Sequence, residues 1–291
     1  MKIGSVLAFV DGGKGSEKVM RTAIAVGNFF SAYVEILHIE RPAGPDIPVV
    51  SEGGGVIAAA EIFEALQREE TDRSKSAENL FQELFVDAGL TVVDAGAVVE
   101  TGASSGSFAW NLVSGHDNRE LAYRGRLFDL IIMAKAEEQD GGVDSAGLEA
   151  ALFDTGRPVL IASDMVIDLS GAQVAIAWDG SREAARSVGL ALPFIEAAGR
   201  VSVLSVGEED EAKGAEDLSR YLARHGVKNE CRSLKNNCGS IAGRLIKETR
   251  DHQVGLLIMG AYGHSAFKEY LFGGVTREML ETGELPLLLA H

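Results

Sequence analysis

Cysteine, aromatic residues and long apolar runs are all scarce in this sequence. Its 291 residues include two cysteines, and aromatic residues make up 7% of the chain. Cys231 and Cys238 form no CxxC pair and have no neighbouring histidine to complete a zinc site, so we interpret both as reduced thiols. The six histidines show no HxxxH spacing, and we therefore predict no metal site built from protein ligands.

Segments that could enter or cross a membrane are also missing from the sequence. No run approaches the roughly 18 consecutive apolar residues of a membrane-spanning helix. The amino-terminal stretch MKIGSVLAFVDGG is apolar, but Asp11 interrupts it and no small-x-small cleavage site follows. We interpret this stretch as a buried strand, and we expect the protein in the cytoplasm with no membrane partner.

Basic residues are fewer than acidic ones, and the excess of acidic residues is larger in the first half of the chain than in the second. The chain has 27 Lys and Arg against 43 Asp and Glu, a net charge of −16, which argues against nucleic acid as a partner. Residues 165–291 contain 14 basic and 17 acidic residues, a net charge of −3, and the first 164 residues carry the remaining −13. An anionic ligand is therefore expected in the second half.

The sequence contains an internal repeat, which suits a length near 300 residues because a single core rarely fills so long a chain. SVLAFVDGGKGSEKVMRTAIAVGNFFSAYVEILHIE at residues 5–40 aligns with QVAIAWDGSREAARSVGLALPFIEAAGRVSVLSVGE at residues 173–208. Each copy reads as an apolar strand, an Asp-Gly turn, an amphipathic helix and a second strand, and Asp11 matches Asp179. The repeat predicts two domains, 1–163 and 172–291.

The apolar strands of both copies are continuous rather than alternating, which is typical of parallel strands buried on both faces by helices. We therefore predict an α/β fold of two tandem, doubly wound, five-stranded parallel-sheet domains. A Pro/Gly-rich loop at 41–55 and a long helix near 57–88 are expected in the first domain. In the second we expect strands near 173–178, 201–206, 228–233, 255–259 and 285–290, and helices near 181–198, 212–225, 239–252 and 274–282.

The last strand of each copy, RPVLIA and LPLLLAH, is apolar and would leave an exposed sheet edge in an isolated domain. We expect residues 158–162 and 286–290 to pack the two copies against each other as a pseudo-dimer. A homodimer of tandem chains is a further expected association.

Glycines lie at both ends of a polar loop that follows the strand near 255–259. Gly260 and Gly263 begin this loop, and Gly273 and Gly274 end it just before a helix. A helix amino terminus offers unpaired N–H groups and a favourable dipole to an anion, so the loop suits a phosphate. A tight turn with a glycine at the helix start explains the same pattern. The Walker sequence GxxxxGK[ST] and the dinucleotide fingerprint GxGxxG are both absent.

The pattern Gx2Gx9G-small-x-[ST], together with an Asp-Gly-Ser turn after the first strand, resembles the universal stress protein A family. The resemblance covers practically the whole chain and is closest in the second copy, at AWDGSREAARSV and GAYGHSAFKEYLFGGVT. It implies that ATP or AMP binds, either alone or with a magnesium ion coordinated by the phosphates. Asp179 would contact the base or ribose, Ala177 and Val206 would line the adenine, and Gly260, Gly263, His264, Gly273, Gly274, Val275 and Thr276 would hold the phosphates.

Two departures from the family pattern bear on binding. Many nucleotide-binding members have Ser where this chain has Gly274, and the loss of one hydrogen bond should cost about 1 kcal/mol. In the first copy AKAEEQ replaces GAYGHS, so Glu137 takes the position of Gly263 and Glu138 adds a second negative charge. We therefore predict that the first domain binds no nucleoside triphosphate.

The resulting hypothesis is an adenine-nucleotide-binding regulatory or stress-response protein with little or no turnover and a regulatory protein partner. No set of general base, nucleophile and oxyanion donors is visible in the sequence. Two alternatives stay open. The copies could form an interaction scaffold with a vestigial loop, or the chain could be an ATP-pyrophosphatase-type enzyme, although VDGGKGS only loosely matches the SGGxDS loop of such enzymes.

Overall fold

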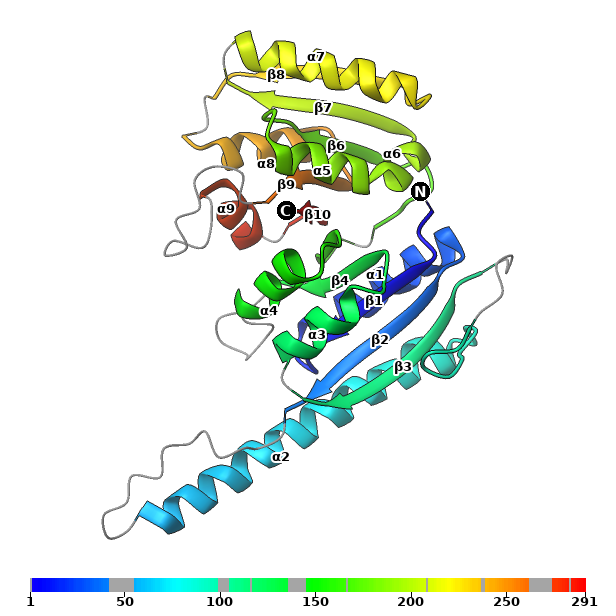
Figure 1. Cartoon of the computed structure of the whole chain (residues 1–291), viewed down its shortest axis with the longest axis vertical. Helices are drawn as coiled ribbons and strands as arrows, with labels where there is room; N and C mark the ends of the chain where they lie inside the picture. Colours follow the sequence, from blue (N-terminus) through cyan, green and yellow to red (C-terminus); the bar gives the residue numbers. More distant parts are fainter. Residues whose placement is uncertain are drawn as a thin grey trace.

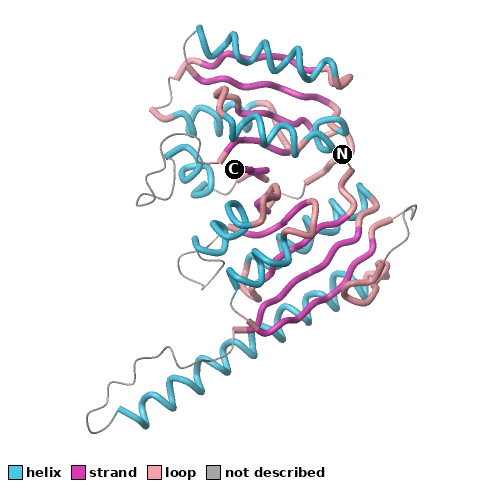
Figure 2. Tube along the Cα trace, in the orientation of Figure 1, coloured by secondary structure: helices cyan, strands magenta, loops and turns pink. Residues whose placement is uncertain are grey.

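The computed structural model describes residues 2–41, 55–98, 105–115, 117–135, 145–165, 167–207, 209–236, 239–261, 274–282 and 284–291. Its described strands form one sheet of ten in the order β3-β2-β1-β4-β5-β10-β9-β6-β7-β8 (Figures 1 and 2). The strands are β1 (Ser5–Val10), β2 (Tyr33–Glu40), β3 (Ser107–Ser114), β4 (Leu130–Ala134), β5 (Val159–Ala162), β6 (Gln173–Ala177), β7 (Arg200–Val206), β8 (Asn229–Leu234), β9 (Leu256–Gly260) and β10 (Leu287–Ala290).

Each half of the sheet has the same internal order. All pairs within a half are parallel, and the first strand of each half, β1 or β6, lies between its second and fourth strands. The halves meet where β5 and β10 pair antiparallel, with Leu288 opposite Leu160. The predicted α/β fold and the pairing of the terminal strands are therefore confirmed.

Helices cover both faces of the sheet, because successive strand residues point alternately to one face and the other. Val6 and Ala8 belong to a buried cluster that also contains side chains of α1, α2, α5, α6 and α7, whereas Leu7 and Phe9 belong to the cluster formed with α3, α4, α8 and α9. The helices are α1 (Gly15–Phe30), α2 (Gly55–Phe81), α3 (Asp117–Gly125), α4 (Ser145–Glu149), α5 (Arg182–Leu190), α6 (Leu192–Ala197), α7 (Glu209–Arg224), α8 (Ile241–Asp251) and α9 (Gly274–Thr282).

Two expected helices differ from their predicted form. The single helix expected at 181–198 is divided into α5 and α6, since Pro193 has no N–H with which to continue the hydrogen-bond ladder. The long helix expected near 57–88 is α2 followed by a π-helical turn, η1 (Gln82–Asp87). A similar turn, η2 (Ala150–Asp154), extends α4.

Side chains also connect the two halves beside the β5–β10 joint. Lys135, just after β4, donates from Nζ to the backbone oxygen of Glu281 in α9 at 2.6 Å. The rings of Phe153 in η2 and His291 lie 4.6 Å apart in an edge-to-face arrangement. The helical segment that precedes the last strand of each half therefore contacts the other half.

Buried ionisable groups in the second half are paired. Glu248 in α8 accepts hydrogen bonds from Arg232 at 3.0 Å and from Arg244 at 2.8 Å. Burial raises the pKa of the Glu248 carboxyl, but these bonds and the nearby positive charges outweigh it and hold the pKa below its ordinary value. Glu248 is therefore an ionised carboxylate that ties α8 to β8.

Among the described helices, none combines the length with the apolar character needed to cross a membrane.

Candidate functional site

The turn after β6 presents Asp179 at the carboxyl end of the sheet. Its Oδ1 accepts hydrogen bonds from the N–H of Ser181 at 2.9 Å and from the Ser181 hydroxyl at 2.6 Å. Gly180 between them has φ +76°, a conformation that glycine adopts without strain. Ser181 also caps α5 by accepting from the N–H of Ala184 at 3.1 Å. The Asp-Gly-Ser sequence therefore fixes an exposed carboxylate and starts a helix in one turn.

Gly260 ends β9, the strand that pairs with β6 on the opposite side from β7. This is the place where the strand order reverses, and ligands of doubly wound sheets bind at the carboxyl ends of strands there. Close packing already requires a glycine at this position. A Cβ on Gly260 would lie 2.5 Å from the backbone nitrogen of Ala184 and 2.8 Å from the carbonyl carbon of Glu183.

The first turn of α9 contains the predicted helix-start residues. Gly274 is exposed, and outside its own helix no described atom lies within 4 Å of the position that a Cβ would take. Val275 is half-buried against the apolar core, and Thr276 is 4% exposed. No described residue outside α9 therefore covers this turn on the side of Gly274.

The structure thus places part of the predicted site together. Ala177 is the last residue of β6, and Asp179 lies two residues further along in the turn. Val206 ends the neighbouring strand β7, and Gly260 ends β9 on the other side of β6. Val206 is half-buried among the apolar residues of the α8–α9 face. The remaining predicted residues, Gly263, His264 and Gly273, lie outside the described residues, so the phosphate cradle remains a prediction.

The corresponding turn in the first half is closed by α2. Gly12 has φ +78°, and a Cβ on it would lie 2.4 Å from the carbonyl oxygen of Arg73. One residue further along α2, the Ser74 hydroxyl lies 3.0 Å from Nε2 of His38, whose Nδ1 lies 2.8 Å from the carbonyl oxygen of Val10. Because that oxygen must accept, Nδ1 carries the proton and Nε2 accepts from the serine. The buried histidine therefore connects β1, β2 and α2.

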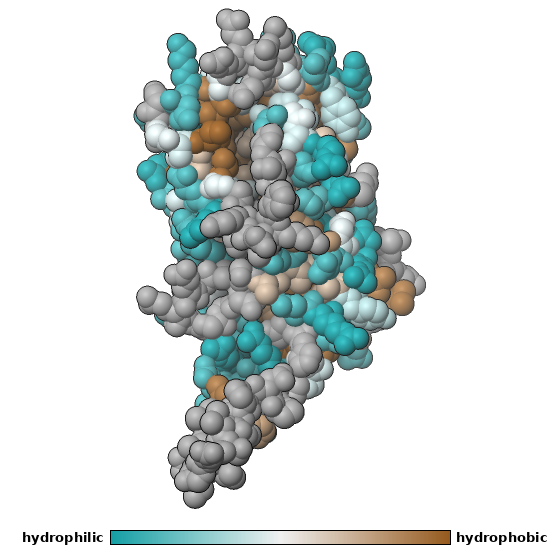
Figure 3. All heavy atoms as spheres, turned by 60° about the vertical axis from the view of Figure 1, so that its left-hand side comes forward, coloured by the Kyte–Doolittle hydropathy of each residue, from teal (hydrophilic) through white to brown (hydrophobic). Residues whose placement is uncertain are grey.

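No described residue of the second half closes the corresponding turn. A Cβ on Gly180, the counterpart of Gly12, would have no described atom within 4 Å. Ser205 occupies the strand position that matches His38, and its buried hydroxyl has no hydrogen-bond partner in the described part of the chain. Sequence reasoning missed this asymmetry, although the unmatched His38 in the aligned repeats was a signal for it. Figure 3 shows apolar side chains gathered among hydrophilic ones in the upper half of the molecule, which is the second half.

In the ranges that the structure describes, no group of three or more His, Cys, Asp or Glu residues lies close enough together to bind a metal ion.

Fold and site together define a class: an α/β protein with two doubly wound halves, in the second of which no described residue covers the glycine of the first turn. No protein-family model matches the chain. It is 25% identical over 169 residues to a universal stress protein of Synechocystis sp., and the matched stretch covers 55% of this chain and 57% of that protein. The chain thus matches little more than half the length of this curated relative.

Solved structures share the fold over nearly the whole chain. A universal stress protein from Archaeoglobus fulgidus superimposes with a TM-score of 0.64 at 14% identity, covering 99% of this chain and 96% of the other. A Pseudomonas aeruginosa protein named as a universal stress protein gives a TM-score of 0.57 at 15% identity, covering 99% and 93%. The resemblance that the sequence predicts is confirmed: the chain is similar to a universal stress protein in sequence and shares the fold of solved ones.

Proposed function

We propose that this chain is an adenine-nucleotide-binding regulatory protein of the universal stress type, and that one ATP or AMP binds in its second half. The observation that supports this most directly is the difference between Gly180 and Gly12. No described atom lies in the space beside Gly180, whereas the backbone of α2 fills the space beside Gly12. A nucleoside can therefore approach the turn of the second half and not that of the first.

The described residues suit such a ligand. The Asp179 carboxylate can accept hydrogen bonds from ribose hydroxyls or from the adenine amino group. Ala177 and Val206 offer a half-buried apolar surface on adjacent strand ends. Amides at the start of α9 and the helix dipole favour the phosphates, and the missing side chain of Gly274 lets them come close. A magnesium ion would then be bound mainly by phosphate oxygens and water.

Regulation without rapid chemistry is part of the proposal. Around Asp179, the Ser181 hydroxyl donates to the carboxylate and also caps α5 by accepting from the N–H of Ala184, so this serine has a structural role and we expect hydrolysis to be slow or absent. A cytoplasmic location and a regulatory protein partner complete the proposed role. A pyrophosphate-release assay with ATP tests the ATP-pyrophosphatase alternative, which predicts multiple turnovers.

Calorimetry with ATP and AMP on the intact chain tests the site, with GTP as the control for the base. We expect one adenine nucleotide per chain. Asp179→Asn should weaken binding roughly tenfold through loss of a charge-assisted hydrogen bond, whereas the matched Asp11→Asn in the first half should leave it unchanged. Two equivalent sites, or equal effects of the two substitutions, would contradict the assignment, and no binding at all would favour the scaffold alternative.

A second substitution separates binding from folding. Gly274→Val places its side chain where no described residue outside α9 lies, so the fold should tolerate it while the phosphates lose their approach to the amides. We expect binding to fall at least tenfold with the melting temperature within a few degrees of the wild type. Gly189→Val in α5 is the control, because it also introduces a branched residue into a helix at an open position. If both variants bind equally well, α9 does not hold the phosphates.

A further inference from the structure

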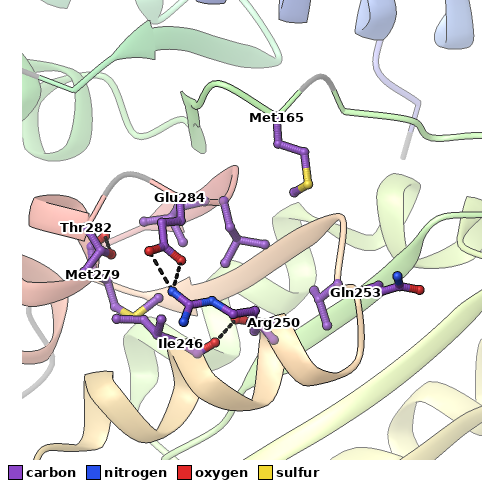
Figure 4. A pocket seen from close by; sticks show the side chains of 11 residues that line it. Met165, Ile246, Arg250, Gln253, Met279, Thr282 and Glu284 are labelled. Atoms are coloured by element: carbon purple, nitrogen blue, oxygen red, sulfur yellow. Dashed lines mark hydrogen bonds and ion pairs between the residues drawn. The ribbon is translucent and has the colours of Figure 1, made fainter.

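A cavity of about 340 Å³ lies between α8, α9 and the segment that joins the two halves (Figure 4). It is bounded by the last turns of α8 and α9, from which the chain enters β9 and β10. The cavity is therefore at the amino ends of these strands, the opposite end of the sheet from Asp179 and Gly260. It is separate from the proposed nucleotide site, and its volume is within the range of about 300–1,000 Å³ found for ligand pockets.

Apolar side chains from four parts of the chain line the interior. Ile246 comes from α8, Met279 from α9, Leu285 from the approach to β10, and Met165 from the joining segment. Met165 is 38% exposed, so one wall is an unbranched thioether that can move. Methionine adapts to ligands of different shape, and two methionines here make an adjustable apolar recess.

A carboxylate-binding group lies at the edge of this recess. Nη2 of Arg250 donates to both oxygens of Glu284, at 2.7 and 2.6 Å, and both side chains are largely exposed. The Nε and Nη1 donors of the same guanidinium have no partner in the described part of the chain. Glu284 thus marks where a carboxylate is bound, and the open donors let a second carboxylate bind beside it or replace it.

We propose that this cavity is a binding site for a small amphipathic carboxylate, such as a medium-chain fatty acid. Its alkyl chain would fill the space between the two methionines, and its carboxylate would bind Arg250. An isolated apolar molecule would leave the Arg250 donors unused, and a purely ionic ligand would leave the apolar recess unfilled. One ligand with both features uses both parts of the cavity.

The test is NMR of the intact chain with isotopically labelled methionine methyl groups, titrated with octanoate. Saturable shifts are expected at Met165 and Met279, with Met20 and Met133, buried in the first half, as internal controls. Arg250→Met should weaken octanoate at least tenfold, and the equally exposed Arg224→Met in α7 should change nothing. Glu284→Gln should tighten binding, because it removes the competing carboxylate.

Matched ligands and a filling substitution complete the design. 1-Octanol has the same alkyl chain without the charge. It should bind the wild type at least tenfold more weakly than octanoate does, whereas the Arg250→Met variant should bind octanol and octanoate equally well. Ile246→Trp should abolish binding by occupying the recess. Shifts spread evenly over all methionines would show detergent-like adsorption and overturn the proposal, as would equal binding of octanoate and octanol to the wild type. ATP is absent from these titrations, so the result does not depend on the nucleotide site.

Discussion

Gly260 has a structural reason to be glycine that can be measured apart from any ligand. In Gly260→Ala the new methyl group would lie 2.5 Å from the Ala184 nitrogen and 2.8 Å from the Glu183 carbonyl carbon. Both contacts are with backbone in the first turn of α5, so no side-chain rotation can relieve them. The end of β9 or the start of α5 must therefore move.

The size of the effect follows from two opposing terms. Overpacking a rigid site typically costs about 1–3 kcal/mol, and replacing glycine with alanine restricts the unfolded chain and returns about 0.4–1 kcal/mol. Gly260 is not among the described residues with positive φ, so no further backbone cost applies. We expect a net loss of about 1–2 kcal/mol, which lowers the melting temperature by several degrees in a domain of this size.

Thermal unfolding followed by circular dichroism measures this loss, and Gly274→Ala is the matched control. A Cβ on Gly274 meets no described atom outside its own helix, so the control should melt within about a degree of the wild type or above it. If Gly260→Ala melts at or above the wild-type temperature, the packing explanation of Gly260 is wrong, and an open approach to a ligand becomes its better explanation.

Two further predictions concern the first half and acid stability. Gly12→Ala should destabilise the chain by more than Gly180→Ala, since both positions have positive φ but only Gly12 would also meet the Arg73 carbonyl; equal melting temperatures would contradict this. The lowered pKa of Glu248 stabilises the folded state at pH values above the carboxyl's unfolded-state pKa, and this stabilisation is lost as pH falls through the folded-state pKa. Urea unfolding should therefore show that Glu248→Gln lowers the free energy of unfolding more at pH 7 than at about pH 3.

Much of the fold could be predicted because its signals are local or repeated. Continuous apolar strands, the aligned copies and the Asp-Gly-Ser turn each depend on a few neighbouring residues, and α9 begins at Gly274 and ends at Thr282 as predicted. The division of α5 from α6 was also readable in principle. Pro193 indicates a break in the helix, but the periodic apolar pattern on both sides of it favours one continuous helix.

The reasons behind individual glycines could not be predicted, because they depend on contacts remote in sequence. Gly12 is constrained by Arg73, and Gly260 by the turn around Ala184. The sequence predicts from Glu137, which lies outside the described residues, that the first half binds no nucleoside triphosphate. The packing of α2 over the β1 turn is a second reason to expect this, and no pattern in the loop could reveal it.

The first half, in which α2 covers the turn after β1, also contributes to the structure of the second half. The strand β10 is buried at Leu287, Leu288 and Leu289. Without β5 of the first half, the edge of β10 that now pairs with β5 would be unpaired and exposed. The first half also holds the last turn of α9 through the bond from Lys135 to the Glu281 carbonyl oxygen, at the far end of the helix whose first turn is proposed to bind phosphate. The first half therefore supports the second, since it pairs with the edge of β10 and donates a hydrogen bond to the end of α9.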